Sequence, residues 1–291
     1  MIFVSGLGVP EGPVLLPDQS WLCVEMGARR GCVTHISTDG RSKRVVARTG
    51  RPNGLAMDKD GIIWVAESSA PSLLRLTMEG EAEVFLTECD GEPFLFPNDL
   101  AFGPDGALYM TDSGIYIEDF APGGEIRPDY KTAAMDGRVY RIDTKTKEIT
   151  KLDDGIRFTN GIAFGPDNSL YVNETITGMV YRYAWRDGEM GERTDFGNVI
   201  NPELPQGYKG PDGMKFGADG NLYVTVVMQG DVTVLGPDGA VVKRIATEGN
   251  FPTNLAFGPR GSKQIYVTEV QFGTMEVHTV DTDGLPLFTR N

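Results

Sequence analysis

The sequence has few cysteines and lacks any long apolar run. Its three cysteines are an odd number without CxxC spacing, so we expect buried, reduced thiols rather than a disulfide framework or a zinc knuckle. No apolar run approaches the roughly 18 residues that a membrane helix requires. The N-terminal stretch MIFVSGLGVPEGP has neither the basic segment nor the cleavage site of a secretory signal. These absences predict a soluble, cytoplasmic protein with no membrane partner.

Positive charge is also scarce. The 291 residues include 27 Lys and Arg against 41 Asp and Glu, which gives a formal net charge of −14. Such a chain repels nucleic acid and anionic lipid, so we expect neither as a partner. The serines lack a GxSxG elbow and a histidine partner, which disfavours acyl-enzyme chemistry.

The chain is rich in glycine and repeats one phrase six times. The copies are VPEGPVLLPDQSWLCVE, RPNGLAMDKDGIIWVAE, FPNDLAFGPDGALYMTD, FTNGIAFGPDNSLYVNE, GPDGMKFGADGNLYVTV and FPTNLAFGPRGSKQIYVTE. In each copy a short apolar strand leads through a turn such as GPDG into a second strand, as in a β-hairpin. A second hairpin usually follows. Matched positions 11, 53, 98, 160, 212 and 253 are 42, 45, 62, 52 and 41 residues apart, a spacing typical of propeller blades.

We therefore predict an all-β fold, a six-bladed β-propeller with four antiparallel strands per blade, forming one domain over residues 1–291. The N-terminal MIFV is expected to pair with the last repeat, because that repeat would otherwise keep an open edge. The long third interval leaves residues 114–136 outside the blade strands. We expect a lid over a functional site there, with a disordered surface insertion as the alternative.

The matched position of each repeat, which we call its head, carries a side-chain oxygen. The heads are Glu11, Asn53, Asn98, Asn160, Asp212 and Thr253. Since the first strand of every blade lies nearest the propeller axis, we expect these oxygens to converge. Two carboxylates among neutral oxygens suit a hard divalent cation such as Ca²⁺ or Mg²⁺ better than zinc. The alternative is that Asn and Asp stand there as turn formers, which does not explain Glu11.

A second set of acids stands at the end of the second strand of five repeats. The set is Glu25, Glu67, Asp112, Glu174 and Glu269, with Val226 at the equivalent position of the fifth repeat. These acids are expected either to be solvated strand ends or to hold the inner amides by hydrogen bonds. The missing acid at Val226 would spare Asp212 a like-charged neighbour and so help it to stay ionised.

The motifs EGP, PND, TNG and PDGM, in this order, resemble the family of senescence marker protein, gluconolactonase and luciferin-regenerating enzyme, and the likeness covers all six repeats. Members are six-bladed propellers with one catalytic divalent metal ion. The resemblance implies that Glu11, Asn160 and Asp212 bind the metal, and that Asn98 ligates it or holds substrate. Asn53 of RPNGLAMD resembles the bacterial gluconolactonase branch and is expected to bind substrate.

Phe96 departs from the family pattern. Animal sugar lactonases of the family carry an arginine at this position, where it contacts sugar hydroxyls. With Phe96 lining the substrate pocket instead, a less polar lactone becomes an alternative to an aldonolactone. The related paraoxonase-type lactonases use a histidine dyad, whereas His35 and His278 fall in an outer hairpin and near the C-terminus and are expected to be surface or packing residues.

The resemblance implies a metal-dependent hydrolase that opens a small-molecule lactone. The cation, with Ca²⁺ favoured and Mg²⁺, Mn²⁺ or Zn²⁺ open, would stabilise the tetrahedral intermediate, and Asp212 would accept a proton from the attacking water. The alternatives are a phosphotriesterase-like hydrolase and a non-catalytic propeller whose structural cation supports ligand or protein binding. The sequence does not indicate the oligomeric state.

Overall fold

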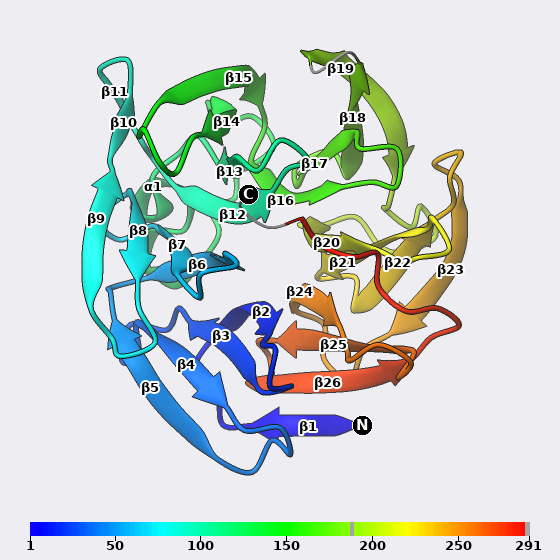
Figure 1. The fold of residues 1–291 in the computed structure, drawn as a ribbon. Coiled ribbons are helices and arrows are strands. Elements are labelled where there is room, and N and C mark those ends of the chain that lie inside the picture. The colour runs from blue at the N-terminus through cyan, green and yellow to red at the C-terminus, as the bar shows by residue number, and fades with distance from the viewer. Residues whose placement is uncertain (187–188, 289–291) are drawn as a thin grey trace.

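The computed structural model describes residues 1–186 and 189–288 and shows the six-bladed β-propeller that the sequence predicts (Figure 1). Six four-stranded antiparallel sheets surround a central axis, and the first strand of each repeat lies nearest that axis. Blade 1 contains β2 (Pro10–Leu15), β3 (Trp21–Glu25), β4 (Cys32–Ile36) and β5 (Lys43–Arg48). Blade 2 contains β6 (Pro52–Met57), β7 (Ile63–Glu67), β8 (Ser72–Leu76) and β9 (Ala82–Leu86). Blade 3 contains β12 (Pro97–Phe102), β13 (Leu108–Asp112), β14 (Gly137–Ile142) and β15 (Ile149–Ile156).

The second half of the chain repeats this order. Blade 4 contains β16 (Thr159–Phe164), β17 (Leu170–Glu174), β18 (Met179–Arg186) and β19 (Glu189–Asn198). Blade 5 contains β20 (Gly210–Phe216), β21 (Leu222–Val227), β22 (Asp231–Leu235) and β23 (Val241–Ala246). Blade 6 contains β24 (Pro252–Phe257), β25 (Gln264–Glu269), β26 (Thr274–Thr279) and β1 (Ile2–Ser5). A hairpin of β10 (Glu88–Cys89) and β11 (Glu92–Pro93) and the short helices α1 (Ile117–Phe120) and η1 (Pro122–Gly124) complete the described elements.

The N-terminal strand closes the ring. β1 is the outermost strand of blade 6 and pairs antiparallel with β26, with Val4 opposite Met275 and Ser5 opposite Thr274. The predicted pairing of MIFV with the last repeat is therefore confirmed. Because β1 supplies the fourth strand, blade 6 has as many strands as the other five blades, and both ends of the described chain are joined in one sheet.

Apolar side chains fill the space between neighbouring blades. One cluster joins Leu22 and Val33 of blade 1 to Leu55 and Val65 of blade 2, and all four side chains are buried. Each buried side chain of this size contributes about 1.5–3 kcal/mol to folding. The three cysteines are free and buried, as predicted. None of the described residues forms a helix of the length and hydrophobicity that a membrane span requires.

Threonine hydroxyls tie consecutive blades together close to the axis. Four hydroxyls each donate to a backbone carbonyl: Thr111 to Asn160 at 2.6 Å, Thr175 to Pro211 at 2.8 Å, Thr225 to Thr253 at 2.7 Å and Thr253 to Pro10 at 2.7 Å. Each bond runs from one blade to the innermost strand of the next. We call them the inter-blade hydrogen bonds. They join blades 3 to 4, 4 to 5, 5 to 6 and 6 to 1, and so connect the strands that carry Glu11, Asn98, Asn160 and Asp212.

The residue after the head is glycine in four repeats because the innermost strands approach one another closely. A Cβ added to Gly213 would lie 2.0 Å from the side chain of Asn254, and one added to Gly54 would lie 2.6 Å from Cα of Asp99. Asp99 and Asn254 follow the heads of the other two repeats. The glycines therefore leave room for these two polar side chains inside the channel.

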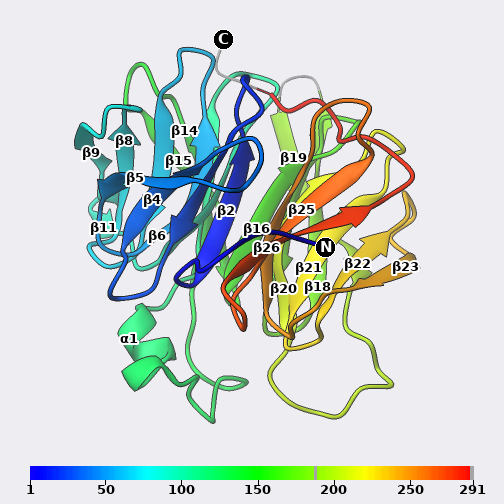
Figure 2. The same cartoon turned by 90° about the horizontal axis from the view of Figure 1, so that it is seen from below.

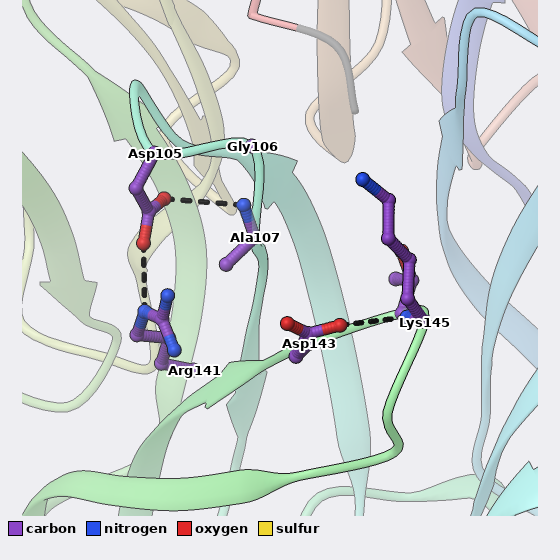
Figure 3. A pocket seen from close by; sticks show the side chains of 7 residues that line it. Asp105, Gly106, Ala107, Arg141, Asp143 and Lys145 are labelled. Carbon is purple, nitrogen blue, oxygen red and sulfur yellow. Dashed lines mark hydrogen bonds and ion pairs between the residues drawn. The ribbon is translucent and has the colours of Figure 1, made fainter. Parts of the chain in front are cut away.

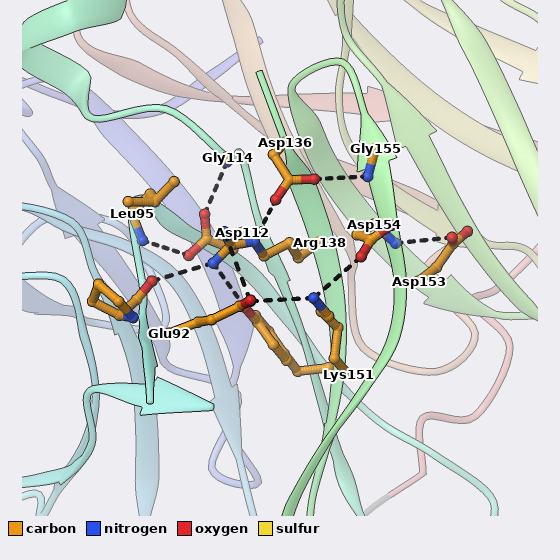
Figure 4. Close-up of polar contacts among 12 residues, drawn as sticks. Glu92, Leu95, Asp112, Gly114, Asp136, Arg138, Lys151, Asp153, Asp154 and Gly155 are labelled. Atoms are coloured by element: carbon orange, nitrogen blue, oxygen red, sulfur yellow. Dashed lines mark hydrogen bonds and ion pairs between the residues drawn. The ribbon is translucent and has the colours of Figure 1, made fainter. Parts of the chain in front are cut away.

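The insertion of residues 114–136 connects β13 to β14 and projects from one end of the propeller (Figure 2). Its base is tightly closed. The Asp136 amide donates to the Gly114 carbonyl at 3.1 Å, and the Gly114 amide donates to the Asp112 carboxylate at 2.9 Å. Arg138 pairs with Asp136 at 3.0 Å within a larger polar network on blade 3 (Figure 4). The insertion is thus anchored to its blade at both ends.

Gly213→Ala should lower the free energy of unfolding by at least about 2 kcal/mol, because its Cβ has no space beside Asn254. Gly61→Ala is the control, since no atom lies within 4 Å of its Cβ and only the left-handed backbone (φ +80°) resists the change, at about 1 kcal/mol. Urea unfolding of both variants measures the difference. Equal losses would show that the strands can move apart.

Candidate active site

The heads gather at one end of the central channel, which we call the mouth. They stand at the start of the innermost strands β2, β6, β12, β16, β20 and β24, which surround the centre in Figure 1. Glu11, Asn53, Asn98 and Asn160 are only 2–5% exposed. Asp212 is partly buried. The structure therefore brings together the predicted metal-binding residues.

Two head amides have fixed orientations. Asn98 donates through Nδ2 to Ser113 Oγ at 2.9 Å, and Asn160 donates through Nδ2 to Thr175 Oγ1 at 3.1 Å. Their Oδ1 atoms are buried and have no hydrogen-bond partner among the described residues. An unpaired buried carbonyl oxygen costs about 1–3 kcal/mol, so these two oxygens are positioned for a ligand.

The two carboxylates of the ring are electrostatically strained. Glu11 accepts a hydrogen bond from Asn254 at 2.8 Å through Oε1, while its buried Oε2 has no partner among the described residues. Burial raises the pKa of Glu11 well above its usual value, and the nearby Asp212 and Asp99 raise it further. Burial and Asp99 also raise the pKa of Asp212, partly offset by Asn160 and Arg51. A bound cation would relieve both groups.

The donor set fits a hard divalent cation. It contains carboxylate oxygens from Glu11 and Asp212 and amide oxygens from Asn98 and Asn160, three of which belong to the buried atoms without a partner. Within residues 1–186 and 189–288, no three His, Cys, Asp or Glu side chains gather as a metal site. Binding would therefore depend on the amide oxygens, which suit Ca²⁺ or Mg²⁺.

Three residues of the channel were not predicted. Lys215 Nζ lies 3.9 Å from Asp99 Oδ2, and Asn254 binds Glu11 as described above. The available signal was the position after the head, where Asp99 and Asn254 replace the glycine of the other repeats. Lys215 follows Asp212 by three residues in a strand, and no pattern marked it.

The expectation that all six heads contribute an oxygen to the mouth was wrong for Thr253. Its hydroxyl donates to Pro10 O at 2.7 Å and lies 2.9 Å from the Thr268 hydroxyl. It is therefore used to join blade 6 to blade 1. The adjacent Asn254 reaches into the channel in its place.

The strand-end acids act differently from both expectations. They are 0–5% exposed, so they are not solvated, and they do not hold the inner amides. Instead each accepts a backbone N–H from the loop that enters the innermost strand of its blade. The five bonds run from the amide of Gly8 to Glu25 at 2.6 Å, of Arg51 to Glu67 at 2.7 Å, of Phe96 to Asp112 at 3.0 Å, of Arg157 to Glu174 at 3.1 Å and of Phe251 to Glu269 at 3.1 Å. The absence of an acid at Val226 does not keep the pKa of Asp212 low.

Aromatic side chains form the rim of the mouth on blades 3 and 4. The Phe158 ring lies 5.7 Å from that of Phe96 and 4.3 Å from that of Phe120 in the insertion. Tyr130 of the insertion contacts Tyr208, 5.2 Å between ring centres, in the loop of residues 199–209. The insertion and this second loop thus meet beside the predicted metal ligands.

The two other predicted substrate residues differ in their surroundings. The side-chain amide of Asn53 makes no hydrogen bond with any described residue, although it is only 5% exposed. Phe96 is 3% exposed and packs under the guanidinium of Arg51, whose Cζ lies 5.1 Å from the ring centre. Asn53 is therefore free to bind a ligand, and Phe96 supports a charged neighbour.

The opposite end of blade 3 has a surface hollow (Figure 3). Asp105 accepts hydrogen bonds there from Arg141 at 2.7 Å and from the Ala107 amide at 3.1 Å. Asp105 and Arg141 form an ion pair in this hollow, which is remote from the heads. The histidines are also remote: His35 lies 2.9 Å from Ser20 Oγ, and His278 lies 2.8 Å from a Glu276 oxygen.

Residues 9–271 match the model of the SMP-30/Gluconolactonase/LRE-like region. The chain belongs to this family. A gluconolactonase from Zymomonas mobilis is 28% identical over 216 residues, covering 72% of this chain and 58% of that protein. The lactonase drp35 of Staphylococcus haemolyticus is 26% identical over 243 residues, 82% of this chain and 70% of that protein. The chain covers less than two thirds of the Zymomonas protein.

Solved structures of the family share the propeller. A gluconolactonase from Xanthomonas campestris superposes with a TM-score of 0.77 at 23% identity, covering 95% of this chain and 87% of that one. The calcium-binding protein regucalcin from Agrobacterium tumefaciens gives a TM-score of 0.80 at 19% identity, with coverage of 100% and 96%. A luciferin-regenerating enzyme gives 0.81 at 16% identity, with coverage of 98% and 96%. These likenesses confirm the fold.

Glu11→Gln should stabilise the metal-free protein increasingly as pH rises. Because the folded-state pKa of Glu11 is raised, the folded chain holds a proton that the unfolded chain has released above about pH 4.3. Wild-type stability then falls with pH by up to about 1.4 kcal/mol per unit until the folded pKa is passed. The glutamine variant does not have this cost.

Thermal unfolding in chelator between about pH 4 and 8 tests this expectation. With saturating Ca²⁺ the order should reverse, because the variant lacks a charged ligand. The exposed Glu203→Gln is the control and should differ from wild type by a pH-independent amount. A pH-independent difference for Glu11→Gln would contradict the strained carboxylate.

Proposed function

We propose that the chain is a metal-dependent hydrolase that opens a lactone. Support comes from the three buried oxygens without partners, Glu11 Oε2, Asn98 Oδ1 and Asn160 Oδ1, beside the partly buried Asp212. The family membership and the gluconolactonase and lactonase relatives favour a cyclic ester as substrate. An aldonolactone and a less polar lactone are both compatible with the rim.

Glu11, Asn160 and Asp212, with Asn98, would hold one divalent cation, for which Ca²⁺ is our first choice and Mg²⁺, Mn²⁺ and Zn²⁺ are alternatives. When bound, the cation supplies a positive charge that polarises the ester carbonyl. Ser113 and Thr175 hold the two amides so that their oxygens, not their nitrogens, face the ligand. The site is then preorganised before substrate arrives.

Asp212 is proposed as the general base. Its carboxylate accepts the proton that the attacking water loses as the water oxygen bonds to the carbonyl carbon. The protonated Asp212 then returns this proton to the ring oxygen as the bond between the carbonyl carbon and the ring oxygen breaks, which leaves the open hydroxy acid. Burial and Asp99 raise the pKa of Asp212 while no cation is bound, and a bound cation would lower it again, so that the carboxylate is ionised and can accept a proton. Asn53, whose amide has no partner among the described residues, would hydrogen-bond a substrate oxygen.

Asp212→Asn should lower kcat by about 100-fold to 10,000-fold, because it removes the base and keeps an oxygen ligand. The Ca²⁺ dissociation constant should rise much less. Acid release from a lactone panel, together with calorimetric Ca²⁺ titration, measures the two effects. Asp167→Asn, in the turn between β16 and β17 at the other end of blade 4, is the matched control. Unchanged turnover would exclude Asp212 from proton transfer.

The same panel separates the two classes of function. A lactonase should lose turnover in chelator and recover it when Ca²⁺ is restored. If wild type opens no lactone, and chelation only lowers its melting temperature, the cation is structural and the hydrolase proposal fails.

We also propose that the insertion of residues 114–136 is a lid over the mouth. Phe120 packs against Phe158 of blade 4 at 4.3 Å between ring centres, so the insertion reaches beyond its own blade. Phe120→Ala should raise KM about tenfold with a smaller change in kcat, because the lid would close less completely. Tyr116→Ala, at an exposed position of the insertion, is the control. Equal KM values for both variants would refute the lid.

A further inference from the structure

Arg51 is a charged residue in an otherwise aromatic rim. It stands two residues before Asn53, as Phe96 and Phe158 stand two residues before the heads of the next two repeats. Its backbone amide donates to Glu67 at 2.7 Å, and its Nη1 donates to Ser68 Oγ at 2.8 Å. These bonds hold the side chain across the Phe96 ring.

The guanidinium of Arg51 has no anionic partner. Among the described residues no carboxylate oxygen lies within the 4.0 Å of an ion pair, and Glu67, Glu118 and Asp212 act on it only from longer range. Burial lowers the pKa of Arg51 from its usual value. A partly buried cation without a partner is costly. At the mouth of a site, this cost indicates an anionic ligand.

Arg193 provides an internal comparison. Its Cζ lies 5.2 Å from the centre of the Tyr181 ring, almost the geometry of Arg51 over Phe96. Arg193 lies on β19, the outer strand of blade 4, and forms an ion pair with Asp153 of β15 at 3.4 Å. Stacking on an aromatic ring therefore does not by itself leave an arginine unpaired in this chain.

The carboxylates of the channel have other partners than Arg51. Glu11 and Asp212 together balance one divalent cation. Asp99 faces Lys215 at 3.9 Å. With the cation bound, the guanidinium of Arg51 still has no carboxylate within ion-pair distance among the described residues.

We propose that Arg51 is the specificity residue of this site and binds a carboxylate on the substrate, so that the preferred substrates are lactones bearing a carboxylate group. This inference rests on the proposed lactonase function. A planar guanidinium binds a carboxylate through two parallel N–H···O bonds. The Phe96 ring packs against the guanidinium of Arg51, and the Phe158 ring supports Phe96 in turn at 5.7 Å between ring centres.

The test uses two lactones that differ in one group. The γ-lactone of glucarate carries a terminal carboxylate where the γ-lactone of gluconate carries a hydroxymethyl group. In the Ca²⁺-loaded wild type, kcat/KM should be at least about tenfold higher for the glucarate lactone. Arg51→Gln should lower it about 30-fold for that substrate, mainly through KM, and less than about threefold for the gluconate lactone. Arg51→Lys should be intermediate, and Arg193→Gln should match wild type.

Equal losses on both lactones, or a wild type without preference, would overturn the assignment. A second measurement separates it from the lactonase proposal. NMR titration of the Ca²⁺-loaded protein with tetrahydrofuroate and with tetrahydrofurfuryl alcohol compares a charged and a neutral ring that cannot be hydrolysed. Tighter binding of the acid that is lost in Arg51→Gln supports the carboxylate site even if no lactone is opened. If Arg51→Gln binds the acid as tightly as wild type, the carboxylate site is refuted even in an active lactonase.

Discussion

The inter-blade hydrogen bonds are the constraint on which the site depends. Each threonine hydroxyl spans from one blade to a backbone carbonyl of the next blade's innermost strand, at 2.6–2.8 Å. Apolar packing alone allows neighbouring sheets to slide, because dispersion contacts are not directional. Hydrogen bonds are directional and fix the register of the inner strands. The head side chains from separate blades therefore meet at defined separations.

The mouth combines two kinds of preorganisation. Near the axis, Ser113 and Thr175 orient the amides of Asn98 and Asn160, and Asn254 holds one carboxylate oxygen of the buried Glu11. Farther out, the buried strand-end acids hold the loops that carry the rim side chains by their backbone amides. Rim residues can then differ between blades without disturbing the inner ring, which would keep the proposed substrate contacts independent of the proposed cation ligands.

The sequence was informative wherever a local pattern repeats. The hairpin phrase predicted six blades, and the head position predicted the ring of Glu11, Asn98, Asn160 and Asp212. It could not show that the Thr253 hydroxyl bonds to Pro10, because that contact spans 243 residues. Nor could it show that Arg51 lies over Phe96, because this depends on one side-chain conformation between two blades. The strand-end acids were located correctly, but their partners are backbone amides that no residue pattern marks.

The shared sixth blade has a consequence for how the protein is made. Glu11 and Asn254, 2.8 Å apart, come from opposite ends of the chain. During synthesis the early repeats can collapse locally, yet β1 cannot pair with β26 until the sixth repeat has left the ribosome. The side of the mouth that contains Glu11 and Asn254 is consequently among the last features to form, after the first and sixth repeats have joined.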